Sequence, residues 1–273
     1  MNAAPRHGWH DVITLALTGH ESDGPAVDWA ADDAAARGIP LQMICLRGPD
    51  ALGAEAQTHA ILTAEERANL RQPAVVITTG AQGAEVGGGG RSVVVVAGRP
   101  SSERITNELT GSVLREVGER SRCPVVIVRG VPEPTGLVVA GVDPRRDGDV
   151  LEFAFSHAAR YGLDLRVVHA GAPRKRLNVF RVERALDIRS ANEDIEVDRR
   201  TNALAMRYSN VRVDVREARR RPREALAREA LGASLLVVGA PARRATAAQL
   251  GPFGNRSLAY VPAIAVIRGR TES

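Results

Sequence analysis

"WAADDAAARGIPLQMICL", residues 29–46, decides the fold because it contains two structural elements and the junction between them. An alanine-rich stretch of helical composition runs up to Gly38, and an apolar strand follows it. Glycine is the residue that most often closes a helix. "FAFSHAARYGLDLRVVHA", residues 153–170, repeats this order. We therefore predict that the chain contains two copies of one unit.

Two further pairs of stretches extend the repeat. "SVVVVAG" (92–98) matches "SLLVVG" (234–239), and "CPVVIVRG" (123–130) matches "VPAIAVIRG" (261–269). Strands that alternate with helices indicate parallel strands joined by right-handed crossovers. We predict an α/β fold of two tandem doubly wound domains, each with a five-stranded parallel sheet.

The boundary between the copies is set by "VPEPTG", residues 131–136, whose prolines and glycine are typical of a linker. We predict a first domain at residues 1–131 and a second at 136–273. The first copy is 16 residues shorter between its first and fourth strands. The deficit is assigned to the segment before the fourth strand, which contains four consecutive glycines, poor helix formers. The third crossover helix of the first domain is therefore expected to be short or missing, and the second domain is expected to have one at about residues 223–231.

Composition restricts the classes of protein and partner. The chain has 273 residues, 44% hydrophobic and 25% charged, as in an ordinary globular protein. It has no apolar stretch of membrane-spanning length and no signal-peptide pattern, so we expect a cytoplasmic protein with no membrane partner. The net charge is +5, but glutamates interrupt the densest basic run, residues 217–229, which lacks aromatic residues. We therefore expect no nucleic-acid partner, and the role of Arg219–Arg223 stays open.

Motifs for metal binding and catalysis are missing from the sequence. The two cysteines form no CxxC, and His7 and His10 have no third ligand nearby, so no metal site is predicted. The chain contains no G-x-S-x-G, no Walker lysine and no paired-carboxylate motif. No catalytic residue is predicted, and we do not expect an enzyme.

The loop after the "VVVV" strand carries the most specific pattern. "GRPS" (98–101) is followed after nine residues by "GSV" (111–113) and then by the Cys-Pro that precedes the last strand. In this spacing the chain resembles the universal stress protein family in its tandem form, over nearly all of both copies. The resemblance implies strand order 3-2-1-4-5, pairing of the two domains as a pseudo-dimer, and ATP as the ligand of members whose loop is intact.

The resemblance implies a nucleotide site in the first domain. Gly-Ser at a helix start offers N–H groups and a hydroxyl to a phosphate. Two positions depart from the family pattern: Ser101 replaces the second glycine, and Thr18 replaces the aspartate that ends the first strand. We predict at most one weak ATP site, with candidate residues Thr18, Leu46, Gly98, Ser101, Gly111, Ser112 and Val113.

The second domain has the complementary defect. It keeps the strand-end Asp143, but Ala242 replaces the second glycine and Pro252 stands where serine is wanted. Proline there removes an N–H group that would face a phosphate. Asp143, Gly239 and Gly251 are therefore the weaker candidates.

These patterns predict a stress-response-type binding protein without catalytic turnover. Two alternatives stay open: a ligand-free scaffold that binds a protein partner, and an ATP-hydrolysing or adenylyl-transferring enzyme of the same nucleotide-binding superfamily. The expected partners are the chain's own second domain, a second copy in a homodimer, or an unidentified protein.

Overall fold

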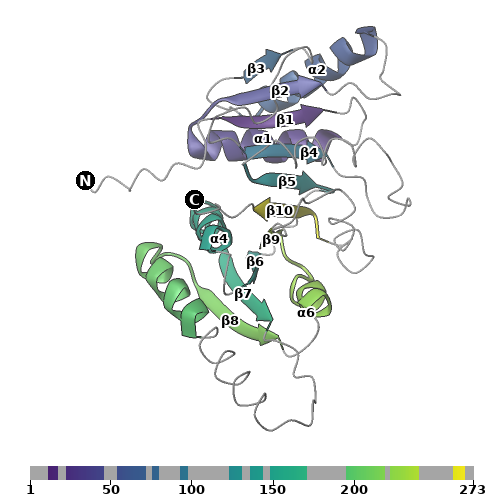
Figure 1. Cartoon of the computed structure of the whole chain (residues 1–273). Helices are drawn as coiled ribbons and strands as arrows, with labels where there is room; N and C mark the ends of the chain where they lie inside the picture. Colours follow the sequence, from purple (N-terminus) through teal and green to yellow (C-terminus); the bar gives the residue numbers. More distant parts are fainter. Residues whose placement is uncertain are drawn as a thin grey trace, which may run out of the picture. The chain divides into compact units, whose positions relative to one another are not determined.

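The computed structural model describes part of the chain, drawn as coloured ribbons in Figure 1. The described elements fall into two compact units, the first containing β1 to β5 and the second β6 to β10. The described residues are 12–17, 23–45, 54–71, 76–79, 93–97, 123–130, 136–143, 148–170, 195–218, 222–239 and 261–267.

The first unit is built on a parallel sheet. β1 lies between β2 and β4, β3 pairs with β2, and β5 pairs with β4, which gives the order β3-β2-β1-β4-β5. β1 and β5 are buried along their whole length, so their side chains form continuous apolar runs rather than an alternating pattern. The strands are Ile13–Leu17 (β1), Leu41–Cys45 (β2), Val76–Thr79 (β3), Val93–Ala97 (β4) and Val125–Val128 (β5).

The second unit repeats this order. β6 lies between β7 and β9, β8 pairs with β7, and β10 pairs with β9, all in parallel. In each unit the described strands therefore follow the predicted order 3-2-1-4-5. The strands are Leu137–Val142 (β6), Asp164–Ala170 (β7), Val213–Ala218 (β8), Leu235–Gly239 (β9) and Ala263–Ile267 (β10).

The helices that follow the first strand of each unit end in the same way. In α1 (Gly24–Arg37), Gly38 adopts the left-handed conformation with φ 63°, and the Ile39 N–H donates to the Ala34 carbonyl at 3.1 Å. In α4 (Gly148–Tyr161), Gly162 has φ 65°, and the Leu163 N–H donates to the Ala158 carbonyl at 2.9 Å. Both glycines close their helix where the sequence predicts, because a residue without Cβ adopts positive φ at little cost.

Further helices cover the sheets. α2 (Ala54–Asn69) packs on β2 and β3 of the first unit. In the second unit, helical residues 195–207 precede β8, and α6 (Pro222–Glu229) lies between β8 and β9. This helix confirms the crossover predicted at about residues 223–231. Figure 1 shows α4 and α6 on opposite sides of the second sheet, as in a doubly wound domain.

The position of the length difference between the copies is corrected by the strand bounds. Thirty residues (46–75) separate β2 from β3, against forty-two (171–212) between β7 and β8. Thirteen residues (80–92) separate β3 from β4, against sixteen (219–234) between β8 and β9. Most of the deficit therefore lies before the third strand, not before the fourth. The expected loss of the third crossover helix concerns residues 80–92, which lie outside the described residues.

Candidate functional site

The carboxyl ends of three neighbouring strands lie level in the first unit. Leu17 at the end of β1 pairs with Cys45 at the end of β2, and Ala16 pairs with Val96 of β4. β2 pairs with one edge of β1 and β4 pairs with the other edge. The direction of strand addition therefore reverses at β1, which makes it a topological switch point. In open α/β sheets, ligands bind outside the carboxyl ends of the strands at this point.

The sequence-predicted residues of the first unit begin at this edge. Thr18, Leu46 and Gly98 directly follow the described ends of β1, β2 and β4. The strand order therefore brings together the starts of the three segments that carry the predicted site. The candidates themselves, Thr18, Leu46, Gly98, Ser101, Gly111, Ser112 and Val113, lie outside the described residues.

Two of the three second-unit candidates are described. Asp143 directly follows β6 and is exposed at the switch point of that sheet. Gly239 is the last residue of β9 and pairs with Ile267 of β10. Gly251 lies outside the described residues.

Gly239 matches Gly98 in the sequence repeat, but the sheet pairings place these two glycines at different positions. β1 starts opposite Val93 of β4, and the corresponding Val138 lies opposite Leu235 of β9. In this register Gly239 corresponds to Ala97, and the residue that corresponds to Gly98 is Ala240. The second unit therefore lacks a glycine at the first position after this strand, which adds to the loss at Ala242.

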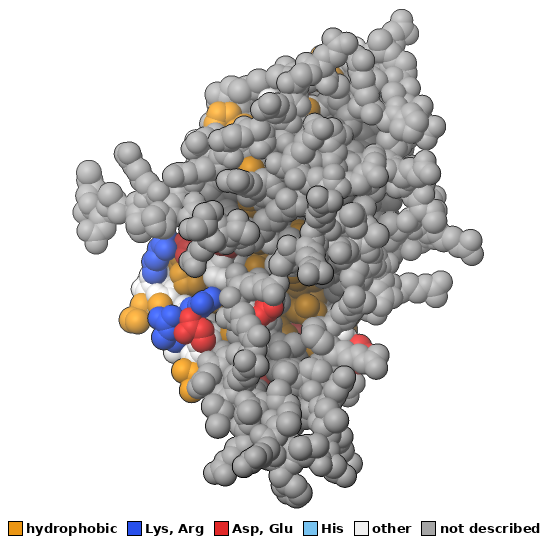
Figure 2. All heavy atoms as spheres, viewed as in Figure 1, with side chains coloured by type: hydrophobic (Ala, Val, Ile, Leu, Met, Phe, Trp, Pro, Cys, Tyr) orange, Lys and Arg blue, Asp and Glu red, His pale blue; other side chains and the backbone are white. Residues whose placement is uncertain are grey.

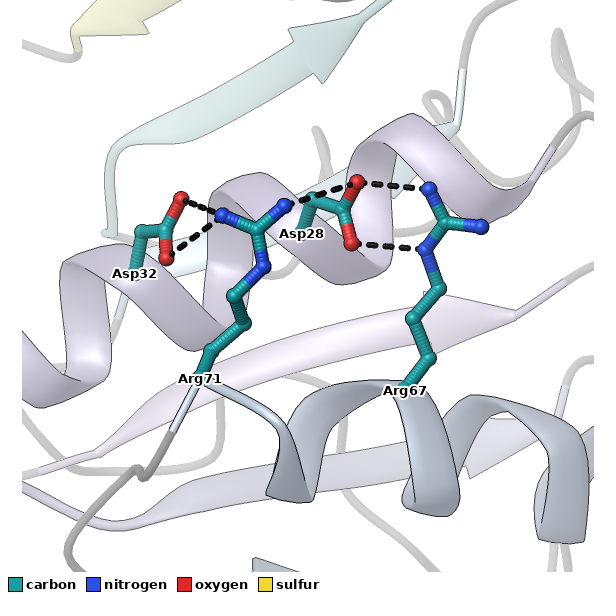
Figure 3. A network of polar contacts seen from close by, with 4 residues as sticks. All are labelled: Asp28, Asp32, Arg67 and Arg71. Carbon is teal, nitrogen blue, oxygen red and sulfur yellow. Dashed lines mark hydrogen bonds and ion pairs between the residues drawn. The ribbon is translucent and has the colours of Figure 1, made fainter.

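An ionic cluster joins α1, which precedes β2 in the chain, to α2, which follows β2. Figure 3 shows this cluster from close by. Arg67 of α2 binds Asp28 of α1 through two hydrogen bonds of 2.6 Å, from Nε and Nη2. Arg71 bridges the two acids of α1: its Nη1 lies 2.9 Å from Asp32 Oδ2 and its Nη2 lies 3.3 Å from Asp28 Oδ2. We call these four residues the ionic joint. It holds α1, the helix that enters from the switch point, against α2.

The surroundings of Arg67 and Asp32 shift the pKa values of both groups. The hydrogen bond to Asp28 raises the pKa of Arg67. Burial raises the pKa of Asp32, and the opposing effect of Arg71 is the smaller one. Both arginines are partly exposed, at 46% and 42% of the side chain, so solvent screens the cluster.

The second unit joins the corresponding helices differently. The Tyr208 hydroxyl donates to Glu152 of α4 at 2.8 Å, and Arg207 lies 3.0 Å from the same carboxylate. The Tyr208 ring stacks on Phe155 with centroids 5.8 Å apart. The Arg207 guanidinium lies 5.2 Å from the centre of the Tyr208 ring. Burial is the largest cause of the raised pKa of Tyr208. We call Glu152, Phe155, Arg207 and Tyr208 the aromatic joint.

The histidines that the structure describes occupy helix and strand positions. His59 lies on α2, and His157 lies buried on α4, in contact with the tilted ring of Tyr161 at a centroid distance of 4.6 Å. His169 is buried on β7, level with Val142 at the end of β6. Within the described ranges, no three His, Cys, Asp or Glu side chains gather as metal ligands would. Nor do these ranges contain a helix that is long and apolar enough to span a membrane.

Basic and acidic side chains alternate on the described part of the surface. Figure 2 shows blue and red side chains next to one another on the face in view. Arg199 and Arg200 both bind Glu196, and Arg212 binds Asp164. Much of the described positive charge is therefore compensated locally, which fits the expectation of no nucleic-acid partner without testing it.

Two sets of residues were missed by reasoning from the sequence. The ionic joint pairs residues 39 positions apart, and no local pattern connects them. Arg129, which directly follows β5, is half-buried, and burial lowers the pKa of its guanidinium. A signal for Arg129 existed, because an Arg-Gly pair ends both copies of the last strand, at residues 129–130 and 268–269.

Comparison with known proteins adds to this geometry. Residues 137–262, nearly the whole of the second unit, match the model of the universal stress protein family. A universal stress protein of Mycobacterium tuberculosis is 26% identical over 288 residues, covering 93% of this chain and 96% of its own length. The second unit belongs to the universal stress protein family. A second universal stress protein of that organism is 25% identical over 272 residues, 85% of this chain and 86% of its own.

Solved structures agree on the fold. A universal stress protein from Archaeoglobus fulgidus superimposes with a TM-score of 0.65 over 97% of this chain and 99% of its own, at 14% identity. A putative universal stress protein from Pseudomonas aeruginosa gives 0.60 over 95% and 94%, at 13% identity. These likenesses extend over both units of the chain, so the α/β fold is common to all three proteins.

Proposed function

We propose that this protein acts by binding and has at most one weak ATP site, in its first unit. The observation that carries the proposal is the switch point at β1. There the ends of β1, β2 and β4 lie level, directly before Thr18, Leu46 and Gly98. A site formed from these loops lies where doubly wound folds bind ligands.

The two units divide the elements of a nucleotide site between them. The first keeps Gly98, Gly111 and Ser112, which suit a phosphate group, but has Thr18 where a carboxylate would face the nucleoside. The second keeps the exposed Asp143 but has Ala240 after β9 and Pro252 in place of serine. Charge-assisted hydrogen bonds to phosphate contribute about 1.5–3 kcal/mol each, so the unit that keeps them should keep more of the affinity.

Binding without turnover is the second part of the proposal. It rests on the sequence, which has no Walker lysine and no nucleophile motif. An ATP-hydrolysing or adenylyl-transferring enzyme is the rival, and a ligand-free scaffold for a protein partner is the third candidate. The cytoplasmic location, the pairing of the two units as a pseudo-dimer, and a homodimer belong to the proposal as well.

Calorimetric titration of the purified chain with ATP, ADP and AMP tests the proposal. Weak saturable binding of ATP, with affinity falling as phosphates are removed, is the expected result. Phosphate and adenylate release are followed in the same samples. Turnover above the protein-free background would support the enzyme hypothesis. If no nucleotide gives binding heat, the ligand-free scaffold is the hypothesis that remains.

A further inference from the structure

β8 forms an accessible edge of the second sheet. Among the described strands it pairs with β7, and Figure 1 shows it as the outermost strand of this unit. The side chains of Asp214 and Arg216 are exposed at 46% and 58%, and Val215 is exposed at 37%. An edge strand presents backbone N–H and C=O groups to which another strand can pair. This edge is therefore a surface on which a partner chain can add a strand.

The ladder with β7 determines which backbone groups of β8 face the edge. The Leu165 N–H donates to the Arg212 carbonyl at 2.8 Å, and Leu165 lies level with Val213. The backbone groups of successive strand residues point to alternate sides, so the even-numbered residues of β8 bond to β7. Val213, Val215 and Glu217 therefore direct their N–H and C=O groups away from β7, toward the edge.

The charges of β8 alternate in sign along one face of the strand. Arg166 of β7 lies level with Asp214 and also binds Glu229 of α6 at 3.2 Å, so this face is the one on the side of α6. Asp214 and Arg216 both lie on it, with Arg216 Nε 2.9 Å from Asp214 Oδ2. Charges of a single sign would repel a second copy of the same edge. A strand that reads Asp-Val-Arg is instead complementary to its own reversed copy.

We propose that two copies of this chain associate through β8, in antiparallel pairing across a two-fold axis at Val215. In this register Asp214 lies opposite the partner's Arg216, and Val215 lies opposite the partner's Val215. The valines form a hydrogen-bonded pair, because their backbone groups face the edge. The opposite charges fall at a non-hydrogen-bonded pair, where side chains of two strands are closest. The inference rests on the homodimer of the proposed function and deepens it, since it names the interface.

Other registers of the same strand are less favourable. An axis at residue 214 or at Arg216 places two identical charges opposite one another, and an axis at Glu217 does the same. An axis at Val213 pairs charges of opposite sign, but it sets Arg216 opposite the turn that precedes the strand. The register at Val215 pairs β8 along its length and places no like charges directly opposite one another.

Sedimentation velocity over a concentration series tests the association. A short edge strand makes a small interface, so we expect the average mass to rise toward twice that of one chain between about 1 and 100 μM. Asp214→Arg and Arg216→Asp should each weaken the dimer by about tenfold or more, because each places like charges on both sides of the axis. An equimolar mixture of the two variants should dimerise again, because each chain then meets charges of opposite sign. Circular dichroism verifies that each variant is folded.

A cysteine at the axis gives a second measurement that leaves the charges unchanged. Residues in a hydrogen-bonded antiparallel pair have Cα atoms about 5.5 Å apart, within the range that a disulfide can bridge. Val215→Cys should therefore form a disulfide-linked dimer under mild oxidation. Glu217→Cys is the matched control: it is exposed on the same edge but lies roughly 14 Å along the strand from its own copy, so it should not cross-link. The unchanged chain, with Cys45 and Cys123, gives the background.

Each contrary result identifies what has failed. A monomer at every concentration would overturn the inference together with the homodimer of the proposed function. A dimer that the charge variants leave unchanged, or equal cross-linking of both cysteine variants, would overturn the inference and leave the homodimer standing. Weakening by both charge variants without recovery in their mixture would mean that the charges do not meet across the axis, which also overturns it. Titration of the unchanged chain with ATP tests the nucleotide site separately.

Discussion

The ionic joint and the aromatic joint solve one structural problem with different chemistry. Gly38 and Gly162 close the two helices, and the register of the following strands aligns Asp28 with Glu152. Asp28 is bound by two arginines, whereas Glu152 is bound by one arginine and by a tyrosine that stacks on Phe155. The position of Phe155 is Ala31 in the first unit. The comparison teaches that strand order and helix caps set the fold, while the contacts between helices are free to change.

A second contrast lies one turn further along the same helices. In α1 the fully buried Asp33 pairs with Arg37, Oδ2 to Nε at 2.8 Å. In α4 the corresponding residues are His157 and Tyr161, whose rings contact each other at a tilt of 41°. The first unit therefore places an ion pair where the second places two rings, so the two units should respond differently to loss of charge.

The largest effect is expected at the centre of the aromatic joint. Phe155 is fully buried and stacks on Tyr208, so Phe155→Ala should destabilise the second unit by about 3–5 kcal/mol, through lost burial and the cavity left behind. Denaturant unfolding measures it with two probes. Both tryptophans, Trp9 and Trp29, belong to the first unit, so circular dichroism should shift more than tryptophan fluorescence. A cost below 1 kcal/mol would mean that the joint is not part of the core.

The next effect concerns the buried ion pair. Arg37→Gln removes one ion-pair partner of a carboxylate with no exposed surface, and we expect a loss of about 3 kcal/mol in the first unit. Tryptophan fluorescence reports it directly through Trp29 on the same helix. Tyr161→Gln at the corresponding position of the second unit is the control and should cost less, because that side chain is 37% exposed. Equal costs would remove the distinction between the two helices.

A smaller effect is expected where α6 approaches its sheet. A Cβ on Gly141 of β6 would lie 2.6 Å from Leu226 Cδ2, whereas the corresponding strand residue of the first unit is Ala16. Gly141→Ala should therefore cost about 1–3 kcal/mol by overpacking. The double variant with Leu226→Ala should show a favourable coupling energy in a double-mutant cycle. Simple additivity of the two costs would indicate that α6 does not pack as described.

The smallest effect is expected at the ionic joint. Its arginines are partly exposed, so Arg67→Ala should cost about 0.2–1 kcal/mol, and the cost should shrink as salt is raised from 0.05 to about 1 M. Tyr208→Phe in the aromatic joint is the matched variant, and its cost should depend little on salt. Similar salt dependence of both variants would contradict the chemical contrast between the joints.

The aromatic joint adds a pH dependence. Because burial raises the pKa of Tyr208 in the folded chain, the hydroxyl ionises in the unfolded chain first. The stability that it contributes is present below its ordinary pKa of about 10 and is lost as pH rises above that value. Tyr208→Phe should remove this alkaline loss, measured as the unfolding midpoint between pH 8 and 11. An unchanged pH profile would place the titrating group elsewhere.

The fold could be predicted from the sequence because its signals are local. Apolar runs mark the strands, Gly38 and Gly162 mark helix ends, and the repeat doubles each signal. The length difference between the copies was assigned to the wrong connection, because the run of glycines near residue 90 is a poor helix former. The connection before β3 is the one that is much shorter than its counterpart in the second unit. The helix joints could not be predicted, since Asp28 and Arg67 are far apart in the chain and resemble solvated charges. Of the candidate site, the sequence identified the strand ends, while the one-residue register shift at Gly239 required the sheet pairings.

Calorimetric titration of three variants with ATP tests the central claim, that the first unit holds the ligand. Gly111→Val should abolish binding, because the larger side chain crowds the phosphate loop. Asp143→Ala should leave the affinity unchanged, and its fold should be intact because this side chain is exposed. Thr18→Asp, which restores the family carboxylate, should tighten ATP binding. If Asp143→Ala abolishes binding while Gly111→Val retains it, the site lies in the second unit and the account is wrong.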